Sequence, residues 1–344
     1  MVCRGFIASL NQGRSWIVLP LLLLCLFSLT TCSRDGLNST PITIGINSWA
    51  GYDPFILADK LDLFNKNNVQ VEIRRFASTT EQAQAMRDGE IQGAGLTLDE
   101  VFSLVGAGFK GKVVLIVDYS MGGDMVIGQK EIKSIAELKG KTIGYEGSVV
   151  GGFLLDRALY KYNLKRSAVK LIDVQADKWH DSFVEKNVDA LVCFNPVATE
   201  LLNEHEGNLL FSSADIPFEI IDVLLFSESF YHDNKPAITK ILRAWFETLS
   251  YIDTNLDKAA EIISAVKNTT PDNYKQGLNS LVAPDLTANR AVFDPTSDKN
   301  IYKYSQAIVD FMMSKNMLSK RIHTAGLFES EVLLEIQNPA VYSR

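Results

Sequence analysis

Two aromatic residues lie where a predicted strand passes into a predicted helix. The segment INSWAGYDPFILADKLDLF, residues 46–64, follows the apolar run ITIGI and carries Trp49 and Tyr52 in the intervening turn. Aromatic rings in such a turn stack on flat or cationic molecules, although one of them can instead pack beneath the turn as core. We expect both rings to line a binding cleft, and Asp53 before Pro54 to cap the helix.

Acidic and hydroxyl side chains recur at the ends of other predicted strands. Asp124 follows Gly122 and Gly123, whose missing side chains allow a ligand to approach the backbone. Glu146 and Ser148 flank a glycine where another strand passes into a helix. The expected ligand-binding residues are Trp49, Tyr52, Thr97, Asp99, Ser120, Gly123, Asp124, Glu146, Ser148, Asn195 and Asp222.

The chemistry of this set favours a cationic or neutral ligand that carries nitrogen. Asp99, Asp124 and Glu146 supply negative charge beside two aromatic rings, which suits an amine, a pyrimidine or another heterocycle. Hydroxyls at Thr97, Ser120 and Ser148, with helix N-terminal amides, would instead suit an anion such as a sulfonate or nitrate. Both alternatives stay open, although no Lys or Arg in these turns offers a bidentate clamp for an anion.

Other classes of site are not indicated. The net charge is −7 and no basic stripe is present, which argues against a nucleic-acid partner. His180, His205, His232 and His323 have no metal-ligand spacing, and neither a nucleophile elbow nor a phosphate loop occurs. The run GYEGSVVGG lacks the spacing of a dinucleotide fingerprint. We therefore expect a binding protein without enzymatic activity, cofactor or metal.

The N-terminal segment has the pattern of an export signal. Arg4 and Arg14 precede the apolar run WIVLPLLLLCLFSLTTC, which is short for a membrane span. The run ends at Cys32 in LTTC, which resembles a bacterial lipobox except that Thr31 replaces the usual smaller residue. We expect a signal peptide at 1–31, then a lipidated Cys32 and a tether to residue 40. A plain secretory signal and an uncleaved anchor are the alternatives.

Removal of residues 1–31 would change the charge and the cysteine count. Two arginines leave with the signal, so 32 basic residues face 41 acidic ones and the net charge becomes −9. Cys3 and Cys25 also leave, and lipidation would occupy Cys32, so Cys193 would be the one free thiol. No disulfide within the chain is then possible.

Short strands alternate with helices from residue 41 onward. Capping-box patterns at 78–81, 97–100 and 134–137 open three of the helices. This alternation predicts an α/β fold with mostly parallel sheets flanked by helices. Strands are expected at 42–46, 69–76, 91–97, 113–119, 125–129, 141–146, 169–174, 188–194 and 220–227, and helices at 54–64, 78–88, 97–106, 147–162, 179–186, 196–205, 235–254, 256–267, 271–281 and 299–315.

The alternation restarts once, which predicts two lobes of similar size. We expect a first lobe at 41–122, a second lobe at 123–221, and a return to the first lobe with C-terminal helices at 222–344. The chain would cross between lobes near 119–125 and again near 221–226. Ligands of such sheets bind at the carboxyl ends of the strands, so the two crevices would face each other across a hinge.

The order of these segments resembles a known family. It is similar to the periplasmic substrate-binding proteins of ABC importers in the nitrate, sulfonate, taurine and thiamine-pyrimidine group. One departure is Phe194-Asn195-Pro196, where the family usually has an aromatic residue directly before the proline. The matching stretches are SWAGYDPFILADKLDLFNKNNVQVEI, EQAQAMRDGEIQGAGLTLDEVFSLVGAG, VVLIVDYSMGGDMVI, IKSIAELKGKTIGYEGSVVGGFLLDRAL, VDALVCFNPVATELL and DVLLFSESFYHDNKPAITKILRAWFETLSYI.

The resemblance implies a two-lobed clamshell of type II that captures a small molecule and presents it to an ABC permease. The protein would be a monomeric lipoprotein, exported to the periplasm or cell surface and held at a bacterial membrane through Cys32. A periplasmic ligand-sensing module of a signalling system would use the same clamshell, and this alternative stays open. The fungal thiamine-pyrimidine synthases share the fold, but they need a cysteine-rich run that is missing here.

Overall fold

The computed structural model describes residues 40–204 and 207–337. The expected signal peptide and Cys32 therefore lie outside the described residues, as does His205. Within the described ranges, no helix combines the length and the apolar character needed to cross a membrane.

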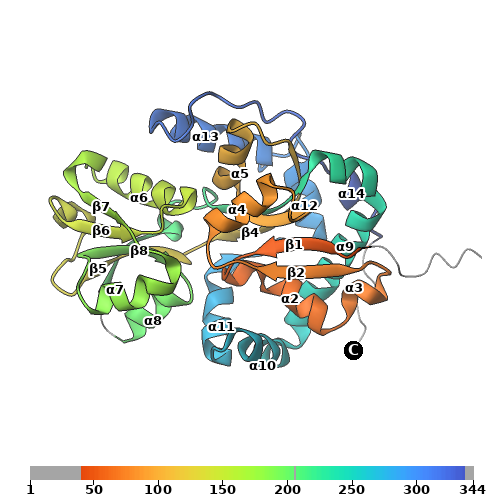
Figure 1. Cartoon of the computed structure of the whole chain (residues 1–344), viewed down its shortest axis with the longest axis horizontal. Helices are drawn as coiled ribbons and strands as arrows, with labels where there is room; N and C mark the ends of the chain where they lie inside the picture. The colour runs from red at the N-terminus through yellow and green to blue at the C-terminus, as the bar shows by residue number, and fades with distance from the viewer. Residues whose placement is uncertain (1–39, 205–206, 338–344) are drawn as a thin grey trace, which may run out of the picture. The chain divides into compact units, whose positions relative to one another are not determined.

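The first sheet has six strands in the order β11-β4-β10-β3-β1-β2 (Figure 1). Strand β1 pairs in parallel with β2 and β3, whereas β10 pairs antiparallel with β3 and β4. Antiparallel β11 extends the sheet beyond β4. The strands are β1 (Ile42–Ile46), β2 (Val71–Arg75), β3 (Gly93–Thr97), β4 (Gly111–Ser120), β10 (Ile221–Ser227) and β11 (Leu281–Val282).

The second sheet has five strands in the order β7-β6-β8-β5-β9. Strand β6 pairs in parallel with β7 and β8, and β5 pairs antiparallel with β8 and β9. The strands are β5 (Asp124–Gln129), β6 (Thr142–Tyr145), β7 (Lys170–Asp173), β8 (Ala190–Phe194) and β9 (Gly207–Ser212). We call the part built on the first sheet the first lobe, and the part built on the second sheet, residues 124–212, the second lobe.

The two sheets with flanking helices confirm the expected α/β class, but the strand pairing is mixed rather than mostly parallel. The antiparallel pairs arise where the chain changes sheets. It leaves the first sheet after Ser120 and returns at Ile221, and β10 then runs back between β3 and β4. The expected second crossover at 221–226 is wrong, because those residues form the buried strand β10 and the chain crosses at 213–220.

Helices lie against both sheets (Figure 1). Helix α9 packs on α2, where the rings of Phe55 and Trp245 lie 4.4 Å apart between centroids. The helices are α2 (Asp53–Lys60), α3 (Leu63–Lys66), α4 (Thr79–Arg87), α5 (Leu98–Gly106), α6 (Val149–Lys161), α7 (Trp179–Val184), α8 (Val197–Asn203), α9 (Glu228–Thr254), α10 (Leu256–Lys267), α11 (Pro271–Asn279), α12 (Leu286–Phe293), α13 (Ile301–Ser314) and α14 (Glu331–Leu334).

The helix expected at 54–64 is interrupted, and its expected cap is absent. Asp62 has a φ of 59°, so the chain turns between α2 and α3 instead of continuing as one helix. The side chain of Asp53 makes no capping hydrogen bond, because Lys267 occupies both of its carboxylate oxygens. Residues 135–138 form the 3₁₀ helix η2 (Ile135–Leu138), where Ser134 Oγ donates to Glu137 Oε1 at 2.9 Å.

Candidate functional site in the interlobe cavities

Two small cavities lie next to each other around Asp124, the first between the two lobes and the second within the second lobe. The first has a volume of about 20 Å³ and the second about 10 Å³, which is room for about one water molecule each. Asp124, Val150 and Phe194 line both cavities. The first is also lined by Asn47, Trp49, Thr79, Thr97, Glu100 and Asp222, and the second by Glu146, Ser148, Gly151, Leu154, Trp179, Val192 and Cys193.

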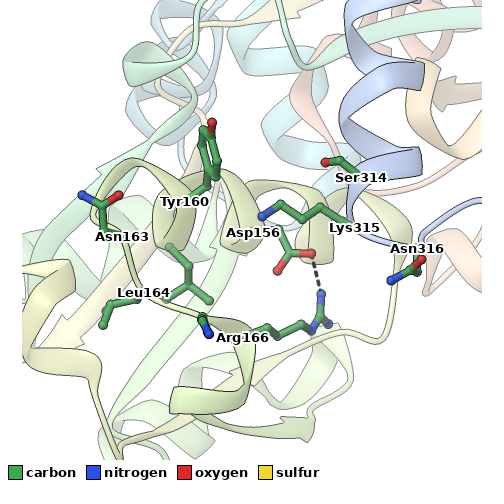
Figure 2. A pocket seen from close by; sticks show the side chains of 10 residues that line it. Asp156, Tyr160, Asn163, Leu164, Arg166, Ser314, Lys315 and Asn316 are labelled. Carbon is green, nitrogen blue, oxygen red and sulfur yellow. Dashed lines mark hydrogen bonds and ion pairs between the residues drawn. The ribbon is translucent and has the colours of Figure 1, made fainter.

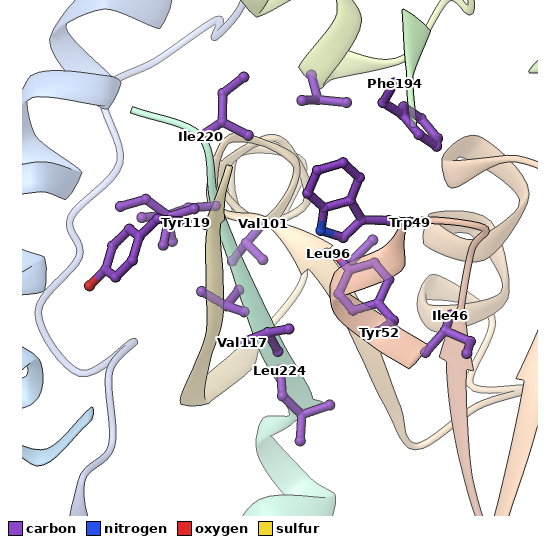
Figure 3. Packing of buried hydrophobic residues seen from close by; sticks show 14 of the residues in the cluster. Ile46, Trp49, Tyr52, Leu96, Val101, Val117, Tyr119, Phe194, Ile220 and Leu224 are labelled. Atoms are coloured by element: carbon purple, nitrogen blue, oxygen red, sulfur yellow. The ribbon is translucent and has the colours of Figure 1, made fainter. Parts of the chain in front are cut away.

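Trp49 forms an aromatic contact between the lobes. Its backbone amide donates to Asn47 Oδ1 at 2.8 Å, which holds the turn after β1, and its indole Nε1 donates to Asp118 Oδ2 at 3.1 Å. The indole meets the ring of Phe194 edge to face, with centroids 6.0 Å apart. Figure 3 shows these rings within the buried cluster.

Gly123 leaves the space that the Trp49 ring occupies. A Cβ atom at Gly123 would lie 2.8 Å from Cζ3 of Trp49 and nearer still to Cη2. Glycine at this position therefore acts through Trp49, since any larger residue would push the indole away from its place.

Tyr52 lies beneath the cavities instead of lining one. Its ring packs over Gly95, where a Cβ atom would lie 2.6 Å from Cε1 of the tyrosine. The hydroxyl donates to Asp222 Oδ1, and Asp222 in turn lines the first cavity. The structure thus brings Trp49 to the cavity, while Tyr52 holds a carboxyl group that faces it.

Buried carboxyl groups surround the cavities. Glu100, Asp124 and Asp222 line the first, and Asp124 and Glu146 line the second. Asp99, in the first turn of α5, lines neither cavity, and all of these groups are buried. Neither cavity is lined by a Lys or an Arg among the described residues.

Burial raises the pKa values of these carboxyl groups. The pKa of Asp99 rises to about 8, through burial and the nearby charge of Glu100. The pKa of Asp118 also rises to about 8 through burial and Asp124, although the bond from Trp49 opposes the rise. Burial raises the pKa of Glu146 to about 7 and that of Asp124 to about 6. Each of these carboxyl groups therefore stays protonated to a higher pH than usual, unless a nearby positive charge stabilises its ionised form.

Several of the carboxyl oxygens have no partner within the described part of the chain. Both oxygens of Asp99, Oδ1 of Asp118 and Oε1 of Glu146 are buried without a hydrogen bond. A buried polar atom left unpaired costs about 1–3 kcal/mol. These unpaired oxygens thus lower the stability of the folded protein, and a hydrogen-bond donor or cation placed among them would remove part of that penalty.

The remaining expected residues divide between the cavities and the crossovers. The Thr97 amide donates to Glu100 Oε2 at 3.0 Å, and Ser148 Oγ accepts the Gly151 amide at 3.4 Å, so both residues begin helices at the cavities. Ser120 Oγ lies 2.8 Å from Ser213 Oγ within the paired crossovers and lines neither cavity.

Asn195 connects the lobes. Its Nδ2 donates to Ser280 Oγ of the first lobe at 2.9 Å, while its Oδ1 accepts the Thr199 amide at 3.2 Å near the start of α8. Asn195 lines a third cavity of about 20 Å³, together with Asp53, Lys267 and Tyr274. The side-chain amide of Asn195 thus makes one hydrogen bond between the lobes and another at the start of α8.

Sequence reasoning missed several residues that line the cavities. Glu100 was interpreted only as the partner of Thr97 in a capping box, yet the same carboxyl group faces the first cavity. Phe194 and Trp179 lie edge to face in the second lobe, 4.9 Å apart between centroids. The aromatic position in front of Asn195-Pro196 was the one available signal for Phe194.

A larger cavity of the described residues lies elsewhere. It measures about 600 Å³ and lies between α6 and the turn that follows α13, where Asp156 accepts from Arg166 at 2.8 Å (Figure 2). None of the expected binding residues lines it. Within the described ranges, no group of three or more His, Cys, Asp or Glu side chains is arranged to hold a metal ion.

Comparison with known sequences identifies the family. The sequence model of the NMT1-like family matches residues 35–267. The chain belongs to the NMT1-like family. A protein of Brucella abortus (strain 2308), provisionally named as a binding protein, is 29% identical over 188 residues, which is 53% of this chain and 56% of that protein. The match thus spans only about half the length of that relative.

A second relative extends over more of the chain. A protein of Haemophilus influenzae, provisionally named as a thiamine biosynthesis protein, is 24% identical over 272 residues. This match covers 78% of the chain and 84% of that protein.

Solved structures show the same fold. The alkanesulfonate-binding protein SsuA of Xanthomonas axonopodis pv. citri, bound to MOPS, aligns with a TM-score of 0.72 at 16% identity, over 86% of this chain and 100% of that one. The periplasmic nitrate-binding protein NrtA of Synechocystis PCC 6803 gives a TM-score of 0.69 at 12% identity, over 87% of this chain and 88% of that one. The NMT1-like chain thus has the fold of periplasmic solute-binding proteins.

Proposed function

We propose that this protein is a solute-binding component of an ABC importer, and that it captures a small nitrogen-bearing cation or heterocycle between its lobes. The observation that carries the ligand class is the set of buried carboxyl groups around the two cavities. Glu100, Asp124, Glu146 and Asp222 face these spaces, and no basic side chain lines them.

A positively charged or proton-donating ligand fits these groups. A cation placed beside Asp124, which lines both cavities, would lie within reach of carboxyl groups from both lobes. It would also supply a hydrogen bond to Oε1 of Glu146, which lines the second cavity and is now buried and unpaired. An anion would meet several carboxyl groups and no compensating Lys or Arg.

The aromatic rings suit the flat part of such a ligand. Trp49 and Phe194 meet across the first cavity, and their faces and edges can pack against a heterocycle or a cationic carbon–nitrogen group. Because the cavities hold only about one water each, a pyrimidine can enter only when these two rings separate. Opening and closing of the lobes would thus accompany binding.

Export and membrane attachment complete the proposal. The protein would be processed before Cys32, carry a lipid there, and deliver its ligand to a permease. The alternative of a sulfonate or nitrate ligand is supported by what the solved relatives are named for, and the carboxyl groups argue against it. A sensing role for the same cleft differs only in the partner protein.

A thermal-shift screen of the chain from Ser33 to Arg344 tests the ligand class. The panel contains 4-aminopyrimidine, thiamine, putrescine and choline, with methanesulfonate and sodium nitrate as the anions. Ligand at about a hundredfold its dissociation constant adds about 2.7 kcal/mol to the free energy of unfolding, which is a visible shift. We expect a shift with at least one nitrogen-bearing cation or heterocycle.

Two outcomes would overturn the proposed ligand class. A shift with methanesulfonate or nitrate alone would show that the carboxyl groups do not select the ligand. A shift of equal size in the Asp124→Asn variant would show that the compound binds outside the cavities. Asp298→Asn, which changes an exposed carboxylate, is the matched control.

A further inference from the structure

A partly buried lysine of the first lobe is bonded to both ends of the turn that carries Trp49. Lys267 Nζ donates to Asp53 Oδ1 and Oδ2, each at 2.9 Å, and to the backbone oxygen of Ser48 at 3.0 Å. A lysine ammonium has three protons, so these bonds can account for all of them. The side chain of Asp53 is 1% exposed and that of Lys267 is 14% exposed.

The bonded positions bracket the aromatic turn. Ser48 directly precedes Trp49, and Asp53 directly follows Tyr52 at the start of α2. Within the turn, the Tyr52 amide donates to the Trp49 oxygen at 3.2 Å and the Asp53 amide donates to the Ala50 oxygen. Lys267 is the last residue of α10, in a part of the chain 214 positions beyond Asp53.

Helices α10 and α11 pack next to the aromatic turn and the start of α2. Helix α10 packs against both α2 and α11, and α11 packs against the turn itself. A Cβ atom at Gly277 of α11 would lie 3.1 Å from Cβ of Ala50, so α11 and the turn are in close contact. Lys267, Asp53 and Asn195 line one cavity, which places this arrangement beside the interlobe bond of Asn195.

We propose that Lys267 is a positioning residue for ligand binding, because its bonds to Ser48 and Asp53 hold Trp49 at the interlobe cavity. Lys267 lines neither cavity that carries the carboxyl groups, so it acts through the turn. The inference rests on the proposed function for its effect on affinity, whereas its effect on Trp49 is independent of any ligand.

Fluorine NMR measures the position of Trp49 directly. The chain from Ser33 contains Trp49, Trp179 and Trp245, so 5-fluorotryptophan labelling gives three signals, and loss of one in Trp49→Phe assigns that residue. Removing Lys267 alone leaves a buried carboxylate unpaired and endangers the fold. The test variant is therefore the double substitution Asp53→Asn with Lys267→Met, which removes both charges. Spectra are recorded without ligand at pH 7.5, above the pKa of about 6 that burial gives Asp53.

We expect the Trp49 signal to move or broaden in the double variant while the Trp179 and Trp245 signals stay in place. The single variant Lys267→Arg keeps Asp53 and can still donate to both bonded positions, so its Trp49 signal should stay as in the wild type. Lys275→Met removes an exposed ion pair with Asp257 on the neighbouring helix and serves as the matched control. An unchanged Trp49 signal in the double variant, or equal movement of all three signals, would overturn the positioning role.

Affinity supplies the second readout. Thiamine and 4-aminopyrimidine are titrated into wild-type protein and the double variant, and we expect binding at least tenfold weaker in the variant. Equal affinity would overturn the proposal. If neither compound nor any other cation of the panel binds the wild-type protein, the proposed ligand class fails, and the fluorine signals still decide the role of Lys267.

Discussion

Raising the pH should destabilise this protein when no ligand is bound. Asp99 and Asp118 have pKa values of about 8 in the folded protein, chiefly because they are buried. In the unfolded chain an aspartate has a pKa of about 3.9. Between pH 6 and pH 7 the folded protein therefore keeps protons that the unfolded chain has lost. A folded state that binds more protons loses stability as the pH rises, so the free energy of unfolding should fall.

The size of the fall follows from the number of protons. Each proton that the folded state holds in excess changes the free energy of unfolding by about 1.4 kcal/mol per pH unit. Asp99 and Asp118 together would give a fall of about 1–3 kcal/mol between pH 6 and pH 7. A fall of that size is a large share of a typical total of about 5–15 kcal/mol. It should lower the melting temperature by at least about 2 °C.

Urea unfolding of the chain from Ser33, followed by circular dichroism at pH 6.0, 6.5, 7.0 and 7.5, measures this dependence. Asp99→Asn with Asp118→Asn should make the curve less steep, with the remaining slope due to groups such as Glu146, whose pKa is about 7. Asp298→Asn at an exposed loop position should leave the curve as steep as in the wild type. A wild-type free energy of unfolding that stays level or rises from pH 6 to pH 7.5 would refute the idea that these carboxyl groups are buried without compensation.

Further predictions concern single residues of the site. Gly123→Ala should displace the Trp49 ring at a cost of about 1–3 kcal/mol, which is about 5- to 150-fold in affinity by calorimetry. Unchanged affinity would show that the ring need not stay in place. Ser280→Ala removes the acceptor of the interlobe hydrogen bond from Asn195 and should weaken ligand binding about fivefold. A lower free energy of unfolding with unchanged affinity would show that this bond serves stability alone. Tyr52→Phe takes away the donor to Asp222 and should lower the free energy of unfolding by about 1–3 kcal/mol in urea, and an unchanged urea midpoint would contradict that bond.

Elements with strong local signals were predictable from the sequence. The apolar spacing of the C-terminal part indicated α10 with the bounds Leu256–Lys267 that the structure has, and the Ser78 cap was correct, since Ser78 Oγ accepts the Glu81 amide at 3.1 Å. Strand β9 and helix α12 were missed. The short GNLLFS segment of β9 becomes a strand through its pairing with β5, which lies far away in the chain.

The site was predictable to the level of the strand ends. Thr97 ends β3, whereas Asp124 and Asp222 lie at the starts of β5 and β10. Strand β10 runs antiparallel to β3, which sets Asp222 opposite Thr97, and all three residues line the first cavity. Which ring of the aromatic turn faces the cavity was not predictable. That choice depends on the space left by Gly95 for Tyr52 and by Gly123 for Trp49, and both contacts join separate segments.

The anchor of the turn was not predictable either. Asp53 beside Pro54 carries the local pattern of a helix cap, and the pattern contains no information about a partner in another helix. In the structure the ammonium of Lys267 takes both carboxylate oxygens, so a tertiary ion pair replaces the local bond.

Titration calorimetry of Asp124→Asn most directly tests whether the carboxyl groups of the interlobe cavities bind the ligand. The titrant is the compound of the thermal-shift panel that gives the largest shift, and wild-type protein and Asp298→Asn are measured beside the variant at pH 7.5. Loss of one charge-assisted bond of about 1.5–3 kcal/mol predicts affinity about 10- to 150-fold weaker in Asp124→Asn, with Asp298→Asn like the wild type. Equal affinity in all three proteins would contradict an acidic binding site between the lobes.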